Sequence, residues 1–185
     1  MTRGPPIRPS EVNGEKPLEL KRALQFGIDI CTGMTVAHQA GIVHRDLKPA
    51  NVLINHEALL KIVDFGVAAA QRESETQLTR TGYVIGSPKY MAPEQILGKR
   101  VDERADIYAL GVILYEMVTG SPPYSRGDHM SVMHQHVEGK ARPPLELNPA
   151  LPPGLSELIV RAMAVDKNKR FQSMDEVRTA LEKFL

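Results

Sequence analysis

Residues 103–119, ERADIYALGVILYEMVT, are apolar on nearly every side of a helix, and this segment constrains the fold more than any other. A surface helix carries one apolar stripe, whereas a helix that is apolar all round has to be buried. Gly120 and the Ser-Pro-Pro that follows end the segment. The sequence therefore predicts one central, buried helix.

Other helices are predicted on both sides of this segment. Apolar residues recur at three- and four-residue steps from Pro17 to residue 40, and Gly41 follows as a stop. Downstream, the patterns predict helices in the PEQILG segment, over the polar stretch 129–138, along a stripe that starts at Leu155, and after the capping pair Ser173 and Glu176.

Two short apolar runs, NVLIN and LLKIVDF, are separated by a polar turn around His56 and Glu57. Runs of this length with a polar turn between them are typical of a β-hairpin. The predicted fold class is mainly α, with one small β-hairpin that carries a polar loop.

The composition indicates a soluble globular chain. The 185 residues suit one domain, and 23 basic against 22 acidic residues make nucleic acid or an anionic membrane an unexpected partner. No apolar run approaches the roughly 20 residues of a membrane span. The single cysteine, Cys31, excludes an internal disulfide and reads as a small apolar helix residue. We expect a cytoplasmic protein.

The segment HRDLKPANVLINHEALLKIVDFG, residues 44–66, concentrates polar chemistry. Phosphoryl transfer needs an acceptor for the hydroxyl proton, metal ligands on the donor phosphates and positive charge near the transferred group. Asp46 suits the first task, Asn51 and Asp64 offer the oxygen ligands that Mg²⁺ prefers, and Lys48 supplies the charge. Each alone has an ordinary explanation, such as a helix cap or a solvated charge, but all four at this spacing do not.

Four ordered motifs, His44-Arg45-Asp46, Lys48-Pro49-Ala50-Asn51, Asp64-Phe65-Gly66 and Ala92-Pro93-Glu94, resemble the signature of eukaryotic-like (Hanks-type) serine/threonine protein kinases. The resemblance is to the bacterial type and runs from residue 17 to the C-terminus. It implies a tail or linker over 1–16 and the helical C-terminal, catalytic lobe of a kinase over 17–185.

The resemblance also implies roles for single residues. Asp46 would be the catalytic base, Asn51 and Asp64 would bind Mg²⁺, and Leu53 would lie beneath the adenine of ATP. Catalysis would also use Lys48, which contacts the transferred phosphate, and Ser87, which hydrogen-bonds near Asp46 and Lys48.

Further roles concern structure and regulation. His44 and Phe65 would stack into an internal spine held by Asp106. Glu94 would pair with Arg170, the alternative being two unrelated surface charges. The resemblance marks Thr79 and Thr81 as an autophosphorylation pair whose phosphates could bind Arg45; the alternative is two solvated loop threonines.

A complete kinase also needs a G-x-G-x-x-G loop, a β3 lysine and an αC glutamate. Residues 1–16 show none of these patterns, so we expect the N-terminal β-lobe to be absent and the chain to form only the floor of the nucleotide site. Weak nucleotide binding and an exposed apolar patch that includes Leu53 and Phe65 would follow. A kinase N-lobe or another protein could cover that cleft.

Two functions from different classes are compatible with the sequence. The first is a serine/threonine kinase catalytic lobe that transfers the γ-phosphate of ATP to a protein substrate, although the missing motifs put independent activity in doubt. The second is a non-catalytic docking module that binds substrates or partners along residues 82–145. A weaker third idea is a small lobe supplied in trans. Retention of Asp46, Asn51 and Asp64 favours the enzyme, since docking alone does not need them.

One further cluster, Asp128 with His129, His134 and His136, invites a metal site. These side chains fall on several faces of one helix, whereas zinc ligands have to converge. A solvated helix face is therefore expected.

Overall fold

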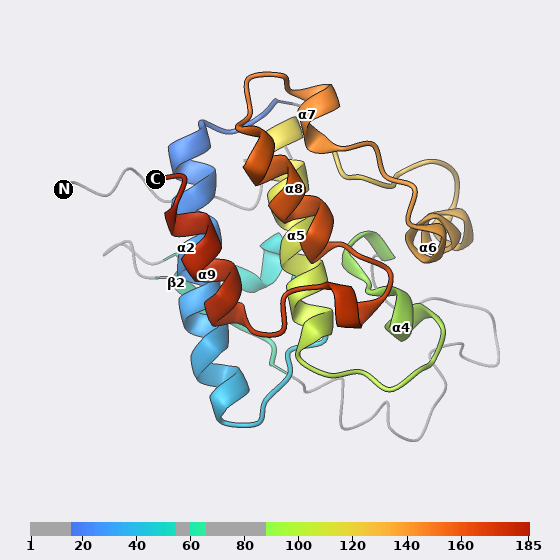
Figure 1. The fold of residues 1–185 in the computed structure, drawn as a ribbon. Helices are drawn as coiled ribbons and strands as arrows, with labels where there is room; N and C mark the ends of the chain where they lie inside the picture. Colours follow the sequence, from blue (N-terminus) through green and yellow to red (C-terminus); the bar gives the residue numbers. More distant parts are fainter. Residues whose placement is uncertain (1–15, 55–59, 66–87) are drawn as a thin grey trace.

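The computed structural model describes residues 16–54, 60–65 and 88–185, and helices dominate these parts of the chain (Figure 1). This confirms the predicted fold class. In chain order the elements are α2 (Leu20–Gln39), η1 (Pro49–Asn51), β1 (Val52–Ile54), β2 (Leu60–Ile62), η2 (Pro88–Tyr90), α4 (Pro93–Ile96), α5 (Arg104–Thr119), α6 (His129–Glu138), α7 (Pro144–Leu147), α8 (Pro153–Ala162), η3 (Lys167–Lys169) and α9 (Met174–Glu182).

Helix α5 is the centre of the molecule, as its sequence predicts. Every residue from 105 to 118 is buried, and the helix ends at Gly120, whose φ of 80° is a left-handed conformation that suits glycine. Figure 1 shows α5 in yellow-green between α2 on one side and α4 and α6 on the other, with α8 packed along it. The polar groups on α5 are therefore held rigidly inside the protein.

Helix α2 packs against both α5 and α9. Cys31 lies on its buried side, and burial raises the pKa of the thiol, as expected for an unreactive, structural cysteine. Neither α2 nor any other helix in the described residues is sufficiently long and apolar to span a bilayer.

Strands β1 and β2 form the predicted antiparallel hairpin, with Val52 opposite Ile62 and Leu53 opposite Lys61. Val52 is buried while Leu53 is 47% exposed, as alternation along a strand requires. The hairpin rests on α2, since Ile62 lies next to Gly33 of that helix. The loop before β1 is thereby held between α2, α5 and the hairpin.

Helix α6 has the predicted bounds but is not a fully solvated helix. Asp128 caps its start by accepting a hydrogen bond of 2.9 Å from the Ser131 N–H. Its inner face buries Val132, Met133 and His136, so the expectation of a solvated face is wrong for His136. Within the described parts of the chain, no three His, Cys, Asp or Glu side chains gather as a metal site.

Helices α5 and α8 approach each other closely at Gly111. A Cβ atom added there would lie 2.9 Å from the Ala162 Cβ and 2.9 Å from the Met163 Cγ. Gly33 on α2 differs, because an added Cβ would meet only the end of the Ile62 side chain at 3.3 Å. The close contact of α5 with α8 thus requires a glycine at Gly111, whereas the packing around Gly33 does not require one.

Gly111→Ala should destabilise the chain by about 1–3 kcal/mol, since overpacking outweighs the gain in helix propensity. Gly33→Ala, the matched control, should be neutral or stabilising by up to about 1 kcal/mol. Urea unfolding followed by circular dichroism measures both. Equal effects of the two substitutions would contradict the close packing of α5 on α8.

Candidate active site

The Asp106 carboxylate, in the first turn of α5, holds the start of the polar loop. It is 1% exposed, and its Oδ2 accepts the His44 N–H at 2.9 Å while its Oδ1 accepts the Arg45 N–H at 2.9 Å. The His38 Nε2 lies 2.8 Å from the same Oδ2. A buried carboxylate is stable only when hydrogen bonds replace its lost hydration, and these groups supply them. The loop is therefore fixed to the central helix.

Arg45 has a φ of 67°, a left-handed conformation that costs a non-glycine residue about 1–2 kcal/mol. Such strain persists only where surrounding contacts determine the backbone. The hydrogen bond from the Arg45 N–H to Asp106 is one of these contacts. The strained residue directly precedes Asp46.

The His44 ring joins the loop to the end of the hairpin. Its Nε2 lies 2.8 Å from the Val63 carbonyl oxygen, and its Nδ1 accepts the Asp46 N–H at 3.2 Å. These partners require a proton on Nε2 and a lone pair on Nδ1. The ring also packs on Phe65, with centroids 4.7 Å apart. The structure thus places His44 in contact with both Phe65 and Asp106, and a role for the three as a spine stays a prediction.

Lys48 and Asn51 both approach the Asp46 carboxylate. The Lys48 Nζ lies 3.3 Å from Oδ2, and the Asn51 Nδ2 lies 3.4 Å from the same oxygen and 2.8 Å from the Asp46 carbonyl. Asn51 is buried, whereas the Asp46 side chain is 46% exposed. The carboxylate is therefore contacted by two neighbours and remains partly open to solvent.

Asp64 follows the end of β2 and is exposed, with a φ of 60°. The preceding residue, Val63, donates its N–H to the Asn51 carbonyl at 2.9 Å. The backbone of Asp64 therefore lies next to Asn51 at the end of the hairpin. No described residue donates a hydrogen bond to the Asn51 side-chain oxygen. An exposed carboxylate and an unused amide oxygen suit a hard cation such as Mg²⁺. Leu53, on β1, is exposed on the same hairpin.

Three predicted site residues, Thr79, Thr81 and Ser87, lie outside the described residues. Their roles, and the pairing of Arg45 with phosphate, stay predictions.

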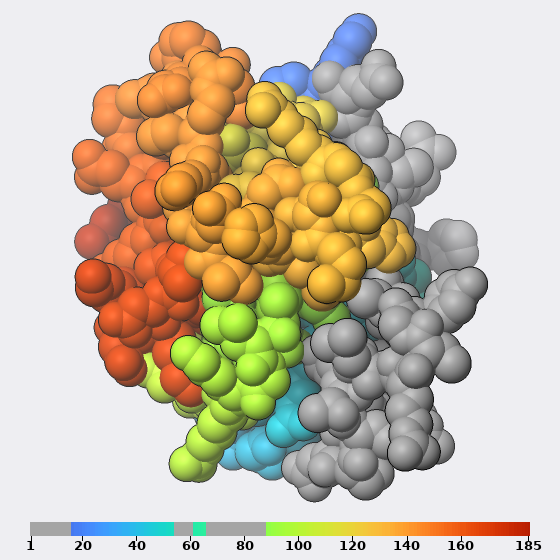
Figure 2. Space-filling model, turned by 90° about the vertical axis from the view of Figure 1, so that its right-hand side faces the viewer, coloured from blue at the N-terminus to red at the C-terminus, as the bar shows by residue number. Residues whose placement is uncertain are grey.

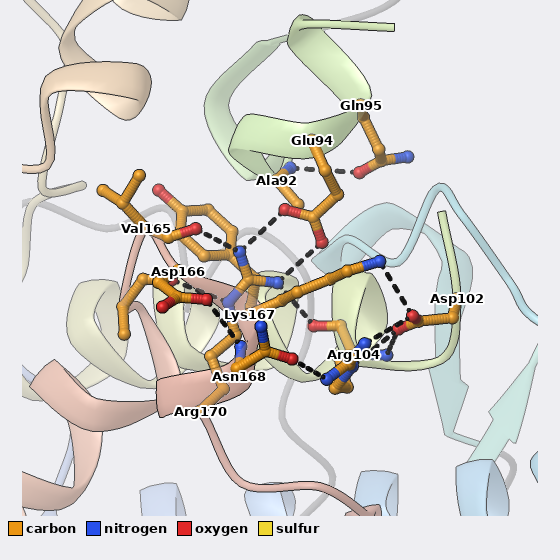
Figure 3. Close-up of polar contacts among 12 residues, drawn as sticks. Ala92, Glu94, Gln95, Asp102, Arg104, Val165, Asp166, Lys167, Asn168 and Arg170 are labelled. Carbon is orange, nitrogen blue, oxygen red and sulfur yellow. Dashed lines mark hydrogen bonds and ion pairs between the residues drawn. The ribbon is translucent and has the colours of Figure 1, made fainter. Parts of the chain in front are cut away.

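Glu94 on α4 and Arg170 form a buried, bidentate ion pair (Figure 3). Both N–O distances are 2.7 Å, and Arg170 also donates to the carbonyls of Ala164, Arg104 and Val165. The guanidinium lies 4.9 Å from the centre of the Tyr108 ring. The predicted pair is therefore in contact, and the alternative of two separate surface charges does not hold.

A second, half-buried set of charges lies beside this pair in Figure 3. Asp102 accepts from Arg104 at 2.8 Å and from Lys167 at 2.9 Å. The Arg104 hydrogen bond, followed by that of Lys167, holds the pKa of Asp102 well below its usual range. These contacts tie the start of α5 to η3.

His136 on α6 is fully buried between two tyrosines. Its Nδ1 lies 2.6 Å from the Tyr108 hydroxyl, and the Tyr124 ring packs on it with centroids 4.7 Å apart. Burial lowers the pKa of His136 to about 4, although the Lys89 main chain acts in the opposite direction. The imidazole is thus neutral at pH 7 and joins α6 to α5.

Sequence reasoning missed two residues of the site, His38 and Gln95. The Gln95 Nε2 donates to the Arg45 carbonyl at 2.8 Å, across 50 positions of sequence. His38 carried one weak signal, since it lies one step beyond the apolar stripe of its helix. Gln95 follows the Ala92-Pro93-Glu94 motif directly, but nothing local distinguishes it from a solvated glutamine.

Residues 10–181 match the protein kinase domain family. The chain belongs to the protein kinase family. The serine/threonine-protein kinase PknB of Mycobacterium tuberculosis (strain ATCC 25618 / H37Rv) is 39% identical over 170 residues, which are 92% of this chain and 27% of that protein.

Two other relatives of this kinase chain are similarly close. PknB of Mycolicibacterium smegmatis is 37% identical over 92% of the chain and 27% of its own length. The probable serine/threonine-protein kinase SCO3848 of Streptomyces coelicolor is 38% identical over 88% of the chain and 24% of its own length. The chain therefore spans about a quarter of these bacterial relatives.

Glu94→Gln should destabilise this kinase chain by about 3–5 kcal/mol, because it leaves the buried Arg170 charge without its partner. Glu146→Gln is the matched control. It removes a carboxylate 3.2 Å from Arg142 in an exposed pair and should cost less than about 1 kcal/mol. Urea unfolding at pH 7 compares them, and a cost below 1 kcal/mol for Glu94→Gln would contradict the importance of the buried pair.

His136 should make the kinase chain less stable as the pH falls from 6.5 to 4. Over this range the unfolded state binds a proton on His136 that the folded state does not, and a pKa shift from 6.5 to about 4 corresponds to about 3 kcal/mol. His136→Gln should remove this loss, and His134→Gln, on the exposed face of α6, should keep it. Urea unfolding at several pH values measures the slopes. Parallel curves for wild type and His136→Gln would refute the assignment.

Proposed function

We propose that residues 17–185 are the catalytic lobe of a serine/threonine protein kinase that transfers the γ-phosphate of ATP to a protein hydroxyl. The observation that carries the proposal is the convergence of Lys48 and Asn51 on one exposed carboxylate, that of Asp46. The family and the serine/threonine kinases among its relatives support it.

In the proposed reaction Asp46 accepts the proton of a substrate serine or threonine hydroxyl. The hydroxyl oxygen then bonds to the γ-phosphorus as the bond from that phosphorus to the β,γ-bridging oxygen breaks, and ADP leaves. Lys48, beside Asp46, offsets the negative charge of the transferred group. Asn51 and Asp64 would hold Mg²⁺, which neutralises the phosphates of the nucleotide.

Other parts of the chain would position the nucleotide and regulate the site. Leu53, exposed on β1, offers an apolar surface for the adenine. A kinase N-lobe or another protein would complete the nucleotide site above this lobe. Thr79 and Thr81 would be phosphorylated and bind Arg45, and Ser87 would contact the catalytic loop.

A docking module remains the second candidate, and one feature favours it. A hollow of about 530 Å³ lies between the end of α5, the loop before α6 and the residues after α6. Tyr115, Tyr124 and two prolines line it, together with the basic residues Arg126, Lys140 and Arg142. In the face shown in Figure 2, the yellow and orange surface around α6 lies directly above the green surface of α4. A peptide bound in the hollow would therefore lie on the side of the molecule that carries α6.

Radiolabel transfer from ATP to a generic protein substrate tests the first proposal. Asp46→Asn should lower the transfer rate by about 10²- to 10⁴-fold, because it removes the base and keeps the shape. Asp175→Asn, which changes an exposed side chain on α9, is the matched control and should leave the rate unchanged. Transfer that survives Asp46→Asn would refute the role of Asp46, and no transfer by the wild type with or without an added kinase N-lobe would favour the docking module.

A further inference from the structure

The peptide group that joins Arg45 to Asp46 is held at both of its ends. Its carbonyl accepts a hydrogen bond of 2.8 Å from the Gln95 Nε2, and its N–H donates to the His44 Nδ1 at 3.2 Å. The two bonds point in opposite directions from one rigid plane. They therefore oppose rotation of this plane. The orientation of the plane sets the direction in which the Asp46 side chain points.

The orientation of the Gln95 amide is fixed by its own surroundings. Gln95 is 5% exposed, and its Oε1 accepts the Ala92 N–H at 3.0 Å, as Figure 3 shows. Because the oxygen is used by Ala92, the amide nitrogen has to point away, toward the Arg45 carbonyl. One side chain thus forms hydrogen bonds both with the main chain at the start of α4 and with the main chain of the loop that carries Asp46.

We propose that Gln95 is a positioning residue of the kinase reaction, which fixes the Arg45–Asp46 peptide plane and couples α4 to the catalytic base. The inference rests on the proposed function, in which Asp46 accepts the hydroxyl proton. Arg45 is strained at φ 67° and its N–H is already bound by Asp106. Without the Gln95 bond the peptide plane is held only at its N–H end, by the His44 Nδ1, and can turn more easily.

A simpler role for Gln95 would be capping α4 alone. Gln95→Glu separates the two roles, because a carboxylate still accepts the Ala92 N–H but cannot donate to the Arg45 carbonyl. Gln95→Met removes both hydrogen bonds without adding charge. Gln135→Glu is the matched control. Gln135 lies on α6, and its Nε2 also donates to a main-chain carbonyl, that of Arg126, at 2.7 Å.

Amide hydrogen exchange of the full chain, followed residue by residue by NMR, tests the proposal. In Gln95→Glu the Asp46 N–H should exchange about three- to tenfold faster while the Ala92 N–H stays protected; in Gln95→Met both should exchange faster. Gln135→Glu should change neither. An Asp46 N–H that exchanges at the wild-type rate in Gln95→Glu, or in Gln95→Met should the charged variant not fold, would overturn the proposal.

Transfer kinetics give a second, separate readout. Gln95→Glu and Gln95→Met should lower kcat and leave the KM of the protein substrate unchanged, because Gln95 is buried and acts through Asp46. An increase in KM alone would contradict a positioning role. If the wild type transfers no phosphate with or without an added kinase N-lobe, the proposed function fails, and the exchange of the Asp46 N–H still decides whether Gln95 holds the loop.

Discussion

The site depends on the buried carboxylate of Asp106. It is placed in the first turn of a helix that has no exposed side from 105 to 118, so it cannot move without disturbing the core. Two main-chain N–H groups of the loop bind it, and a lone buried carboxylate would be too costly to keep charged. Loop and core therefore stabilise one another. Loss of either would leave unsatisfied polar groups inside the protein.

The segment around α4 is held by a different principle, a buried charge pair. The five N–H donors of Arg170 are used by Glu94 and by three main-chain carbonyls, which satisfies a guanidinium that has no access to water. Such a pair adds little net stability compared with apolar packing, but it fixes one geometry. That geometry places Gln95, the next residue, against the loop.

The sequence was sufficient to predict the parts of the fold that follow from local pattern. The helix over 103–119, the hairpin around β1 and β2 and the grouping of Asp46, Lys48 and Asn51 all depend on residues close in the chain. His38 and Gln95 were missed because their partners lie 68 and 50 positions away and neither residue belongs to a recognised motif. Glu94 and Arg170, which are 76 positions apart, were paired only because the family resemblance indicated it. His136 was misplaced for a related reason: its burial depends on tyrosines from α5 and from the loop before α6.

Two non-glycine residues in the described parts of the chain have positive φ, and each belongs to the proposed site. Glycine would adopt these angles without strain, but it lacks the guanidinium and the carboxylate that the proposed function uses. Arg45 and Asp64 therefore carry strain that has to be offset by neighbours. For Arg45 the neighbours are Asp106 and Gln95; Asp64 follows Val63, whose carbonyl lies 2.8 Å from the His44 ring. Because His44 also binds the Asp46 N–H, one imidazole links the two strained turns, and Asp46 and Asp64, the proposed base and metal ligand, are positioned as a unit.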